Sequence, residues 1–220
     1  MVARFALQNV LMTASDGSRR QRTFSCGWVL VAATAVLAAT LAAALPASAQ
    51  GLVITKTPLV PVPSIDLKRY MGRWHELARF PNRFQSDCVG AATADYALQA
   101  GGKVQVINRC PQAGGKVDEA IGEARRIGPA GSPKLEVRFA PAWLSWLPFV
   151  WGDYWVVDID PGYQLAVVSE PKREYLWVLA RQSQVDAATW EALMGRLREK
   201  GFDLSRLQRA AAAASSPSRP

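Results

Sequence analysis

The sequence predicts an all-β fold, an eight-stranded antiparallel up-and-down barrel with one C-terminal α-helix packed against its outside. Short β-prone segments, separated by turns that contain glycine or proline, recur from residue 72 onward. In residues 134–139, KLEVRF, apolar and polar side chains alternate strictly, which is typical of a strand with one buried face. Near the C-terminus the apolar spacing changes to that of a helix. Closing eight antiparallel strands removes both sheet edges, and a barrel of this size can hold one small ligand.

Eight segments fit the strands of this barrel. They are residues 73–80, 88–98, 103–110, 117–127, 134–139, 153–159, 163–169 and 175–180. Glycine pairs and Gly-Pro or Asp-Pro-Gly sequences lie between several of them, as expected for tight turns. The regular succession of strands and short turns predicts antiparallel neighbours throughout.

One helix is predicted after the last strand. Its apolar stripe consists of Trp190, Leu193, Met194 and Leu197. Asp186 precedes this stripe as a candidate N-cap, and Gly201 follows it in the position of a C′ glycine. We expect the stripe to be buried against the outer surface of the barrel.

The first 49 residues are interpreted as a secretory signal peptide. Arg19, Arg20 and Arg22 precede an uncharged run over residues 23–45, and a proline and the triplet Ala-Ser-Ala follow. We expect cleavage after Ala49. An uncleaved anchor is the alternative, because the run is long enough to span a bilayer. The rest of the chain is divided into a Pro-rich leader (50–64), the barrel (65–207) and a disordered tail (208–220).

The charge of the chain argues against a nucleic-acid partner. Four of the 26 basic residues and one of the 18 acidic residues precede Gln50, so the mature chain keeps 22 bases and 17 acids, a net charge of +5. These bases are scattered, whereas nucleic-acid binding needs a concentrated basic stripe. A weak attraction to anionic lipid head groups is compatible with this charge.

The sequence carries no pattern typical of an enzyme or a cofactor site. G-x-S-x-G, Walker and dinucleotide-binding motifs are absent. His75 is the only histidine, so a metal cluster or a histidine-based triad lacks a second histidine. Glu76 shares the predicted inward face with Trp74, and we interpret it as a buried structural acid, a functional carboxylate being the alternative. We therefore expect no catalytic residue, no metal and no cofactor.

Three segments, in order, resemble the motifs of the lipocalin family. Gly72-Arg73-Trp74 resembles the G-x-W motif of the first strand. Residues 66–84 look like the entry segment of the subgroup that holds bacterial lipocalins, apolipoprotein D and plant temperature-induced lipocalins. Residues 152–168 and 175–181 are similar to the second and third motifs. The resemblance covers residues 65–207 and implies a barrel that binds a small hydrophobic ligand.

The resemblance also implies how one end of the barrel is closed. Trp74 would plug this end, and Arg181 would cross the base to stack on its ring, with Gly72 beside them. A guanidinium over an indole contributes roughly 0.5–2 kcal/mol. Gly72, Trp74 and Arg181 are therefore predicted to be structural residues and not catalysts.

Two cysteines remain in the mature chain, and a disulfide between Cys88 and Cys110 is predicted. They flank a glycine hairpin almost symmetrically, cross-strand neighbours have suitable separations, and an exported protein can be oxidised. Free thiols, or a catalytic cysteine as in the prostaglandin synthase relative, are the alternatives. No cysteine lies near Ala49, and Cys26 lies at the wrong end of the apolar run. We therefore expect a periplasmic or secreted protein, not a lipid-anchored lipoprotein.

The lining of the ligand chamber follows from strand alternation, starting from the inward positions that the family pattern gives to Trp74 and Arg181. The expected lining residues are Ala78, Tyr96, Val137, Phe139, Trp155, Trp177 and Leu179. Trp155 is included by analogy with the family alone. A β-bulge would reverse these faces locally.

Residues 140–151, APAWLSWLPFVW, are unusually apolar for a connection between strands. The predicted contact residues of this segment are Trp143, Leu144, Trp146, Leu147 and Phe149. Two prolines and the lack of alternation favour a loop over a buried strand, and strand counting places this loop at the open end of the barrel. An exposed apolar patch marks a binding surface, and tryptophan favours the membrane–water interface. We predict contact with a membrane or with the ligand tail; a homodimer contact or a lid is the alternative.

Two functions remain open at this point. The leading hypothesis is a module that carries or stores a small hydrophobic ligand, a fatty acid or lysophospholipid, in cell-envelope lipid maintenance. The alternative is an enzyme or scavenger with the same fold that acts on a bound lipid or lipid peroxide.

Overall fold

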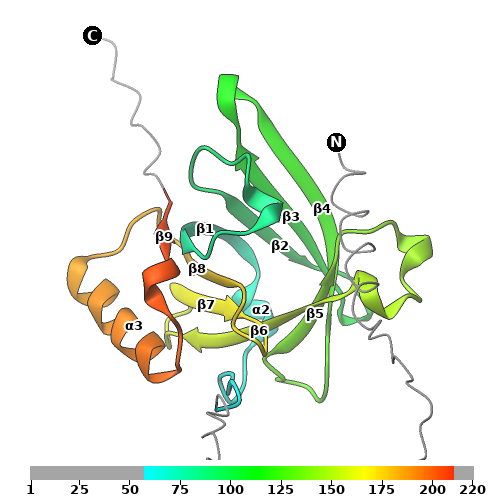
Figure 1. The fold of residues 1–220 in the computed structure, drawn as a ribbon. Helices are drawn as coiled ribbons and strands as arrows, with labels where there is room; N and C mark the ends of the chain where they lie inside the picture. The colour runs from blue at the N-terminus through cyan, green and yellow to red at the C-terminus, as the bar shows by residue number, and fades with distance from the viewer. Residues whose placement is uncertain (1–56, 211–220) are drawn as a thin grey trace, which may run out of the picture. The chain divides into compact units, whose positions relative to one another are not determined.

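The structure, a computed structural model, describes residues 57–210 and has the predicted barrel. Each strand pairs antiparallel with the next, and β1 pairs with both β2 and β8, which closes the sheet (Figure 1). The strands are β1 (Gly72–Arg79), β2 (Thr93–Leu98), β3 (Val104–Pro111), β4 (Val117–Arg126), β5 (Lys134–Arg138), β6 (Gly152–Ile159), β7 (Leu165–Ser169) and β8 (Leu176–Ala180). The predicted signal peptide lies outside the described residues.

A short helix, α2 (Leu67–Tyr70), leads into β1 and was not predicted. The carboxylate of Asp66 caps it by accepting hydrogen bonds from the backbone amides of Lys68 and Arg69. Leu67 and Tyr70 are buried. The helix therefore places an aromatic side chain at the bottom of the barrel.

The C-terminal boundary of the barrel needs correction. Residues 208–210 were assigned to the disordered tail, but Gln208–Arg209 form strand β9, which pairs with β1. The backbone amide of Ala210 donates to the carbonyl of Leu77 at 2.9 Å. The Arg209 guanidinium lies 4.0 Å from the centroid of the Trp190 ring, so both backbone and side-chain contacts hold this segment.

Helix α3 (Ala187–Glu199) packs against the outside of the barrel, as predicted (Figure 1). Asp186 caps it by accepting from the backbone amide of Thr189, and Gly201 after it has a positive φ of 77°. The predicted apolar stripe is buried in an outer core with residues of β1, β6, β7 and β8. No helix within residues 57–210 is long and apolar enough to span a membrane.

A second core fills the closed half of the barrel interior. It contains Trp74, Tyr70 and inward-facing residues of β2 to β8. Strand β7 lies between the two cores, and all five of its residues are buried. Leu165 and Val167 face the outer core, whereas Ala166 and Val168 face the inner one. This burial on both faces explains why the first four residues of β7, 165–168, are all apolar.

Candidate ligand-binding chamber

The open half of the barrel encloses a cavity of about 530 Å³, which lies in the size range of small-molecule pockets. All eight strands of the barrel contribute to its wall. Small side chains at Ala92, Ala94 and Ala120 leave space between larger aromatic and aliphatic residues. The result is a mainly apolar chamber.

Five of the seven predicted lining residues face this chamber. They are Tyr96, Val137, Phe139, Trp177 and Leu179. The alternation assumed for β2, β5 and β8 is therefore correct. The indole Nε1 of Trp177 donates to Oε1 of Gln85 at 2.8 Å, so its polar atom is satisfied by the first loop.

The prediction for Ala78 was wrong. Ala78 is fully buried, but it belongs to the outer core together with Phe80. The register between β1 and β8 shifts between Glu76 and Ala78, which marks a β-bulge. A bulge adds one residue to a strand and reverses the faces beyond it. The alternation that places Trp74 and Glu76 inside therefore does not extend to Ala78.

The prediction for Trp155 was also wrong. Its ring packs against the outer core, and the Nζ atom of Lys134 lies 4.2 Å from the ring centroid. Its neighbour Tyr154, which sequence reasoning missed, lines the chamber instead. Tyr154 has the same parity as the inward-facing Val156, which was the available signal. That signal was obscured because β6 is apolar on both faces.

Glu76 is a buried acid in the chamber wall, and each of its two carboxylate oxygens has a partner. Its Oε1 lies 2.5 Å from Nη1 of Arg79, and its Oε2 accepts from Nε2 of Gln85 at 2.6 Å. Gln85 also accepts from Asn82. The contacts of Glu76 with Arg79 and Gln85 support its interpretation as a structural acid.

The closed end has the stacking that the sequence resemblance implied. The Cζ atom of Arg181 lies 3.9 Å from the centroid of the fully buried Trp74 ring. Its guanidinium donates to the backbone carbonyls of Arg69, Met71 and Arg73 at 2.7–2.8 Å. Gly72 has a φ of 93°, and a Cβ there would lie 3.3 Å from Nη1 of Arg181. Glycine thus provides both the backbone conformation and the space.

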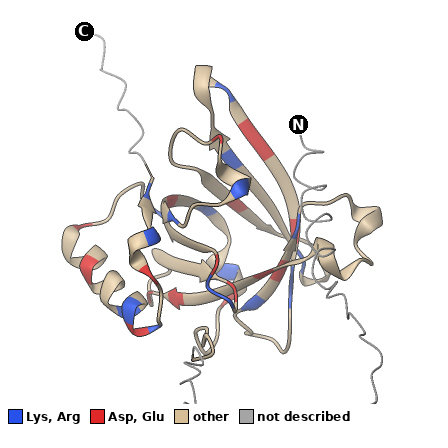
Figure 2. Cartoon of the chain, viewed as in Figure 1, with Lys and Arg blue, Asp and Glu red and all other residues tan. Residues whose placement is uncertain are grey.

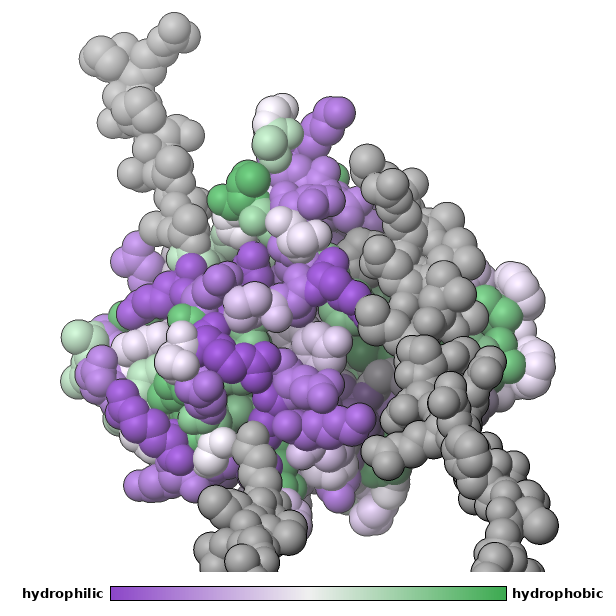
Figure 3. Space-filling view, in the orientation of Figure 1, coloured by the Kyte–Doolittle hydropathy of each residue, from purple (hydrophilic) through white to green (hydrophobic). Residues whose placement is uncertain are grey.

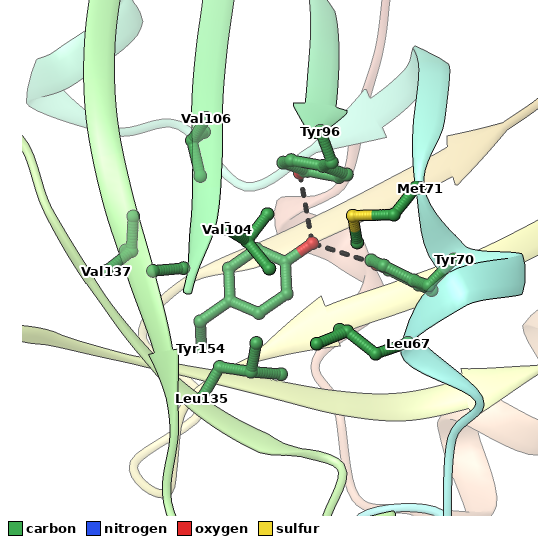
Figure 4. Close-up of a pocket in the computed structure, with 10 residues that line it drawn as sticks. Leu67, Tyr70, Met71, Tyr96, Val104, Val106, Leu135, Val137 and Tyr154 are labelled. Atoms are coloured by element: carbon green, nitrogen blue, oxygen red, sulfur yellow. Dashed lines mark hydrogen bonds between the residues drawn. The ribbon is translucent and has the colours of Figure 1, made fainter. Parts of the chain in front are cut away.

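Three tyrosines form the floor between chamber and closed end (Figure 4). The hydroxyl of Tyr154 lies 2.8 Å from that of Tyr70 and 3.0 Å from that of Tyr96. Burial raises the pKa of Tyr96 to about 12 and also raises the pKa values of the other two. All three hydroxyls therefore keep their protons at ordinary pH and can donate hydrogen bonds.

The rim of the chamber is built from the connections that were predicted to lie at the open end. The first and fifth connections contribute residues 84–85 and 149–151, the seventh contributes Lys172 and Glu174, and Cys110 and Asp118 flank the third. The Cys88–Cys110 disulfide is present, with a Cα–Cα distance of 5.5 Å, which confirms that prediction. The pKa of Asp153 at this rim is raised, mainly by burial and to a smaller extent by repulsion from Glu136 and Glu170.

The connection between β5 and β6, residues 140–151, is called the aromatic loop below. It consists of two short 3-10 turns and is not a strand, as predicted. The side chains of Trp143 and Trp146 are 74% and 76% exposed, Phe149 is 44% exposed, and Leu144 and Leu147 are half-buried. Figure 2 shows this protruding loop without charged residues, and apolar side chains gather at the same edge in Figure 3.

The base of the aromatic loop is held firmly. The Arg125 guanidinium lies 3.9 Å from the centroid of Trp151, and Arg138 approaches the same ring at 5.2 Å. The indole of Trp151 donates to the carbonyl of Ser145 at 2.8 Å. These contacts hold the base of the loop in place. Phe149 and Trp151 also line the chamber, so the loop lies at its rim.

Metal-ligating side chains do not gather in the described part of the chain. No group of three or more His, Cys, Asp or Glu side chains within residues 57–210 is placed to hold a metal ion. His75 does not line the chamber, and the disulfide occupies both cysteines of this region.

Comparison with known proteins agrees with this geometry. Residues 65–212 match the family model described as a lipocalin-like domain. Temperature-induced lipocalin-1 of Arabidopsis thaliana is 39% identical over 150 residues, covering 67% of this chain and 80% of the relative. The outer membrane lipoprotein Blc of Escherichia coli K12 is 31% identical over 178 residues, covering 80% and 92%. Insecticyanin from the tobacco hornworm Manduca sexta shares the fold, with a TM-score of 0.54 at 20% identity, over 70% of this chain and 85% of that chain.

Proposed function

Because this chain belongs to the lipocalin family, we propose that it carries or stores a fatty acid or lysophospholipid in its barrel. We place this role in cell-envelope lipid maintenance. The single observation that carries the proposal is the mainly apolar chamber of about 530 Å³, open at one end between the loops. Such a space favours an acyl chain over a sugar or a nucleotide, which would leave many polar groups without partners.

Filling the chamber is expected to weaken ligand binding. Ala120 lies on β4, is buried, and lines the cavity, so Ala120→Trp places an indole where the ligand would lie. We expect its affinity for a fluorescent fatty acid and for lysophospholipid to fall at least roughly tenfold, which corresponds to about 1.4 kcal/mol. Fluorescence titration measures this directly.

The matched control is Ala97→Trp, which adds the same ring to an exposed position on β2. This variant should bind as the unmodified protein does. Equal affinity in the unmodified protein and in both variants would contradict a ligand site inside the barrel. Native mass spectrometry of the purified protein would identify the lipid that accompanies it.

The aromatic loop supports a further part of the proposal, a peripheral contact with the membrane during loading. Two largely exposed tryptophans project from a loop without charges, beside the mouth of the chamber. Indole rings favour the level of the lipid head groups. The contacts of Trp151 with Arg125 and the carbonyl of Ser145 hold the base of the loop beside the mouth.

Removing both indoles is expected to weaken this contact. We predict that Trp143→Ser with Trp146→Ser lowers co-flotation with phospholipid vesicles severalfold, while fatty-acid binding persists. Val117→Ser with Ile121→Ser is the matched control, because it removes two exposed apolar side chains from β4. Undiminished flotation of the tryptophan variant would contradict membrane contact. A change in its oligomeric state instead would identify this loop as a homodimer contact.

We further infer that the chain is exported to the periplasm or secreted, with cleavage near Ala49 and without lipid anchoring. The order of basic residues, apolar run and Ala-Ser-Ala triplet supports this, as does the lack of a cysteine at the expected cleavage site. The intact mass of the mature protein should correspond to a chain that begins at Gln50. An acylated N-terminus would contradict the inference.

A further inference from the structure

The tyrosine floor contains one hydrogen more than its own hydrogen bonds use. Tyr70 in α2, Tyr96 in β2 and Tyr154 in β6 provide three hydroxyl hydrogens. Tyr154 takes part in both O–H···O contacts, which use two of them (Figure 4). No other hydrogen bond among residues 57–210 involves these hydroxyl oxygens. If the two bonds run head to tail, the remaining hydrogen belongs to Tyr70 or to Tyr96, and if Tyr154 accepts from both, it belongs to Tyr154. The head-to-tail order is favoured, because each hydrogen bond then polarises the next.

The surroundings of the two ends differ. Tyr70 faces a void of only about 20 Å³, whose other walls include Leu67, Met71 and Leu135 (Figure 4). Tyr96 borders this void and also lines the main chamber. A buried donor without an acceptor is costly, whereas a donor directed into the chamber can meet water or a ligand. The favoured order is therefore Tyr70 donating to Tyr154, Tyr154 donating to Tyr96, and Tyr96 donating into the chamber.

The rings leave this donor little freedom to move. Tyr96 stacks on Tyr70 with centroids 5.7 Å apart, and its ring meets that of Tyr154 edge to face at 6.2 Å. Tyr70 in turn lies 5.0 Å from Trp74 at the closed end. The donor is thus held at a fixed depth, opposite the open rim.

We propose that the Tyr96 hydroxyl is a binding group for an oxygen atom at the inner end of the ligand, so that the chamber accepts hydrophobic chains oxygenated at the end that enters first. An acyl chain with a hydroxyl or keto group at its far end has this chemistry. The proposal rests on the proposed function, because it assumes that the acyl chain enters the barrel. It adds that the floor of the chamber tolerates a polar chain end that an entirely apolar floor would reject.

The test compares palmitic acid with its ω-hydroxy derivative, each displacing a bound fluorescent fatty acid. The unmodified protein should bind the two with affinities within about threefold, because Tyr96 compensates for the desolvation of the ω-hydroxyl. In Tyr96→Phe the affinity for the ω-hydroxy acid should fall roughly tenfold relative to that for palmitic acid in the same variant. Saturable binding of palmitic acid by this variant also reports that the barrel remains folded.

Tyr70→Phe is the matched control, since it removes one hydroxyl from the opposite end of the same row of hydrogen-bonded tyrosines. It should leave both affinities unchanged, because Tyr154 and Tyr96 still provide the donor. An ω-keto chain, which accepts but cannot donate, should behave like the ω-hydroxy acid in all three proteins. This arm tests the direction of the hydrogen bond without a further variant.

Several results would overturn the proposal. Equal losses for both acids in Tyr96→Phe would assign this hydroxyl a purely structural role. A selective loss of ω-hydroxy acid binding in Tyr70→Phe would assign the binding group to Tyr70 instead of Tyr96. Rejection of the ω-keto acid would show that the ligand donates the hydrogen bond and the floor accepts it. Failure of the unmodified protein to bind palmitic acid would remove the proposed function as well. If the unmodified protein binds palmitic acid but Tyr96→Phe does not change the affinity for the ω-hydroxy acid, Tyr96 is rejected as the binding group and the proposed function still stands.

Discussion

Arg181→Ala is expected to lower the free energy of unfolding by about 3 kcal/mol, the sum of a lost cation–π contact and several lost charged hydrogen bonds. The guanidinium covers the ring of Trp74 and donates to the backbone carbonyls of Arg69 in α2, Met71 between the two elements and Arg73 in β1. Truncation leaves these carbonyls without their donor and exposes one face of the indole. For a domain of this size the melting temperature should fall by about 6–12 °C.

The same substitution should leave ligand preference unchanged, because Arg181 does not line the chamber. Arg181→Lys is the control, since it keeps the charge but cannot reproduce the planar fork of donors. It should recover only part of the lost stability. A full melting temperature in Arg181→Ala, or altered ligand preference at full stability, would contradict a closure role. Thermal unfolding followed by circular dichroism, together with ligand titration, provides both measurements.

Glu76→Leu is expected to destabilise the barrel by about 3–5 kcal/mol, because removing one partner of a buried ion pair leaves the other charge uncompensated. The Arg79 side chain is 13% exposed and meets the Glu76 carboxylate at 2.5 Å. Gln85 loses its acceptor as well, which loosens the first loop at the chamber rim. Urea denaturation should show a lower midpoint with an unchanged slope.

The control for this prediction replaces both charges. Glu76→Leu combined with Arg79→Met removes the isolated charge and fills similar space, so the double variant should be more stable than Glu76→Leu alone. If the single variant is as stable as the unmodified protein, the ion pair contributes nothing to folding. If the double variant is less stable than the single one, the uncompensated charge is not the cause of the loss.

Local patterns in the sequence were sufficient for much of the fold. Alternation in residues 134–139 identified the inward face of β5, and helical spacing identified the stripe of α3, because each pattern depends only on the period of its own element. The cysteine pair flanking a glycine hairpin also identified the disulfide, although the two residues are not cross-strand partners: the β2–β3 ladder ends at Thr93 and Arg109, and Cys88 lies before β2. The stacking of Arg181 on Trp74 was inferred from the family resemblance and is present.

Tertiary structure decided the faces of Ala78 and Trp155. The bulge in β1 is a change of register against β8, and register belongs to a pair of strands, not to one. Strand β6 is covered on both faces, so hydrophobicity alone did not distinguish Tyr154 from Trp155. The bulge also explains how Glu76 and Arg79, three residues apart, meet on one face although strict alternation would separate them.

The sequence by itself thus determined that this chain forms a barrel of eight strands with an outer helix and one closed end. Only the tertiary structure determined what lies at the floor of the chamber. Tyr70 and Tyr154 are 84 residues apart, and Tyr96 and Tyr154 are 58 apart, yet their hydroxyls are within hydrogen-bond distance. No local period links such positions, because barrel closure and strand register together bring them into contact.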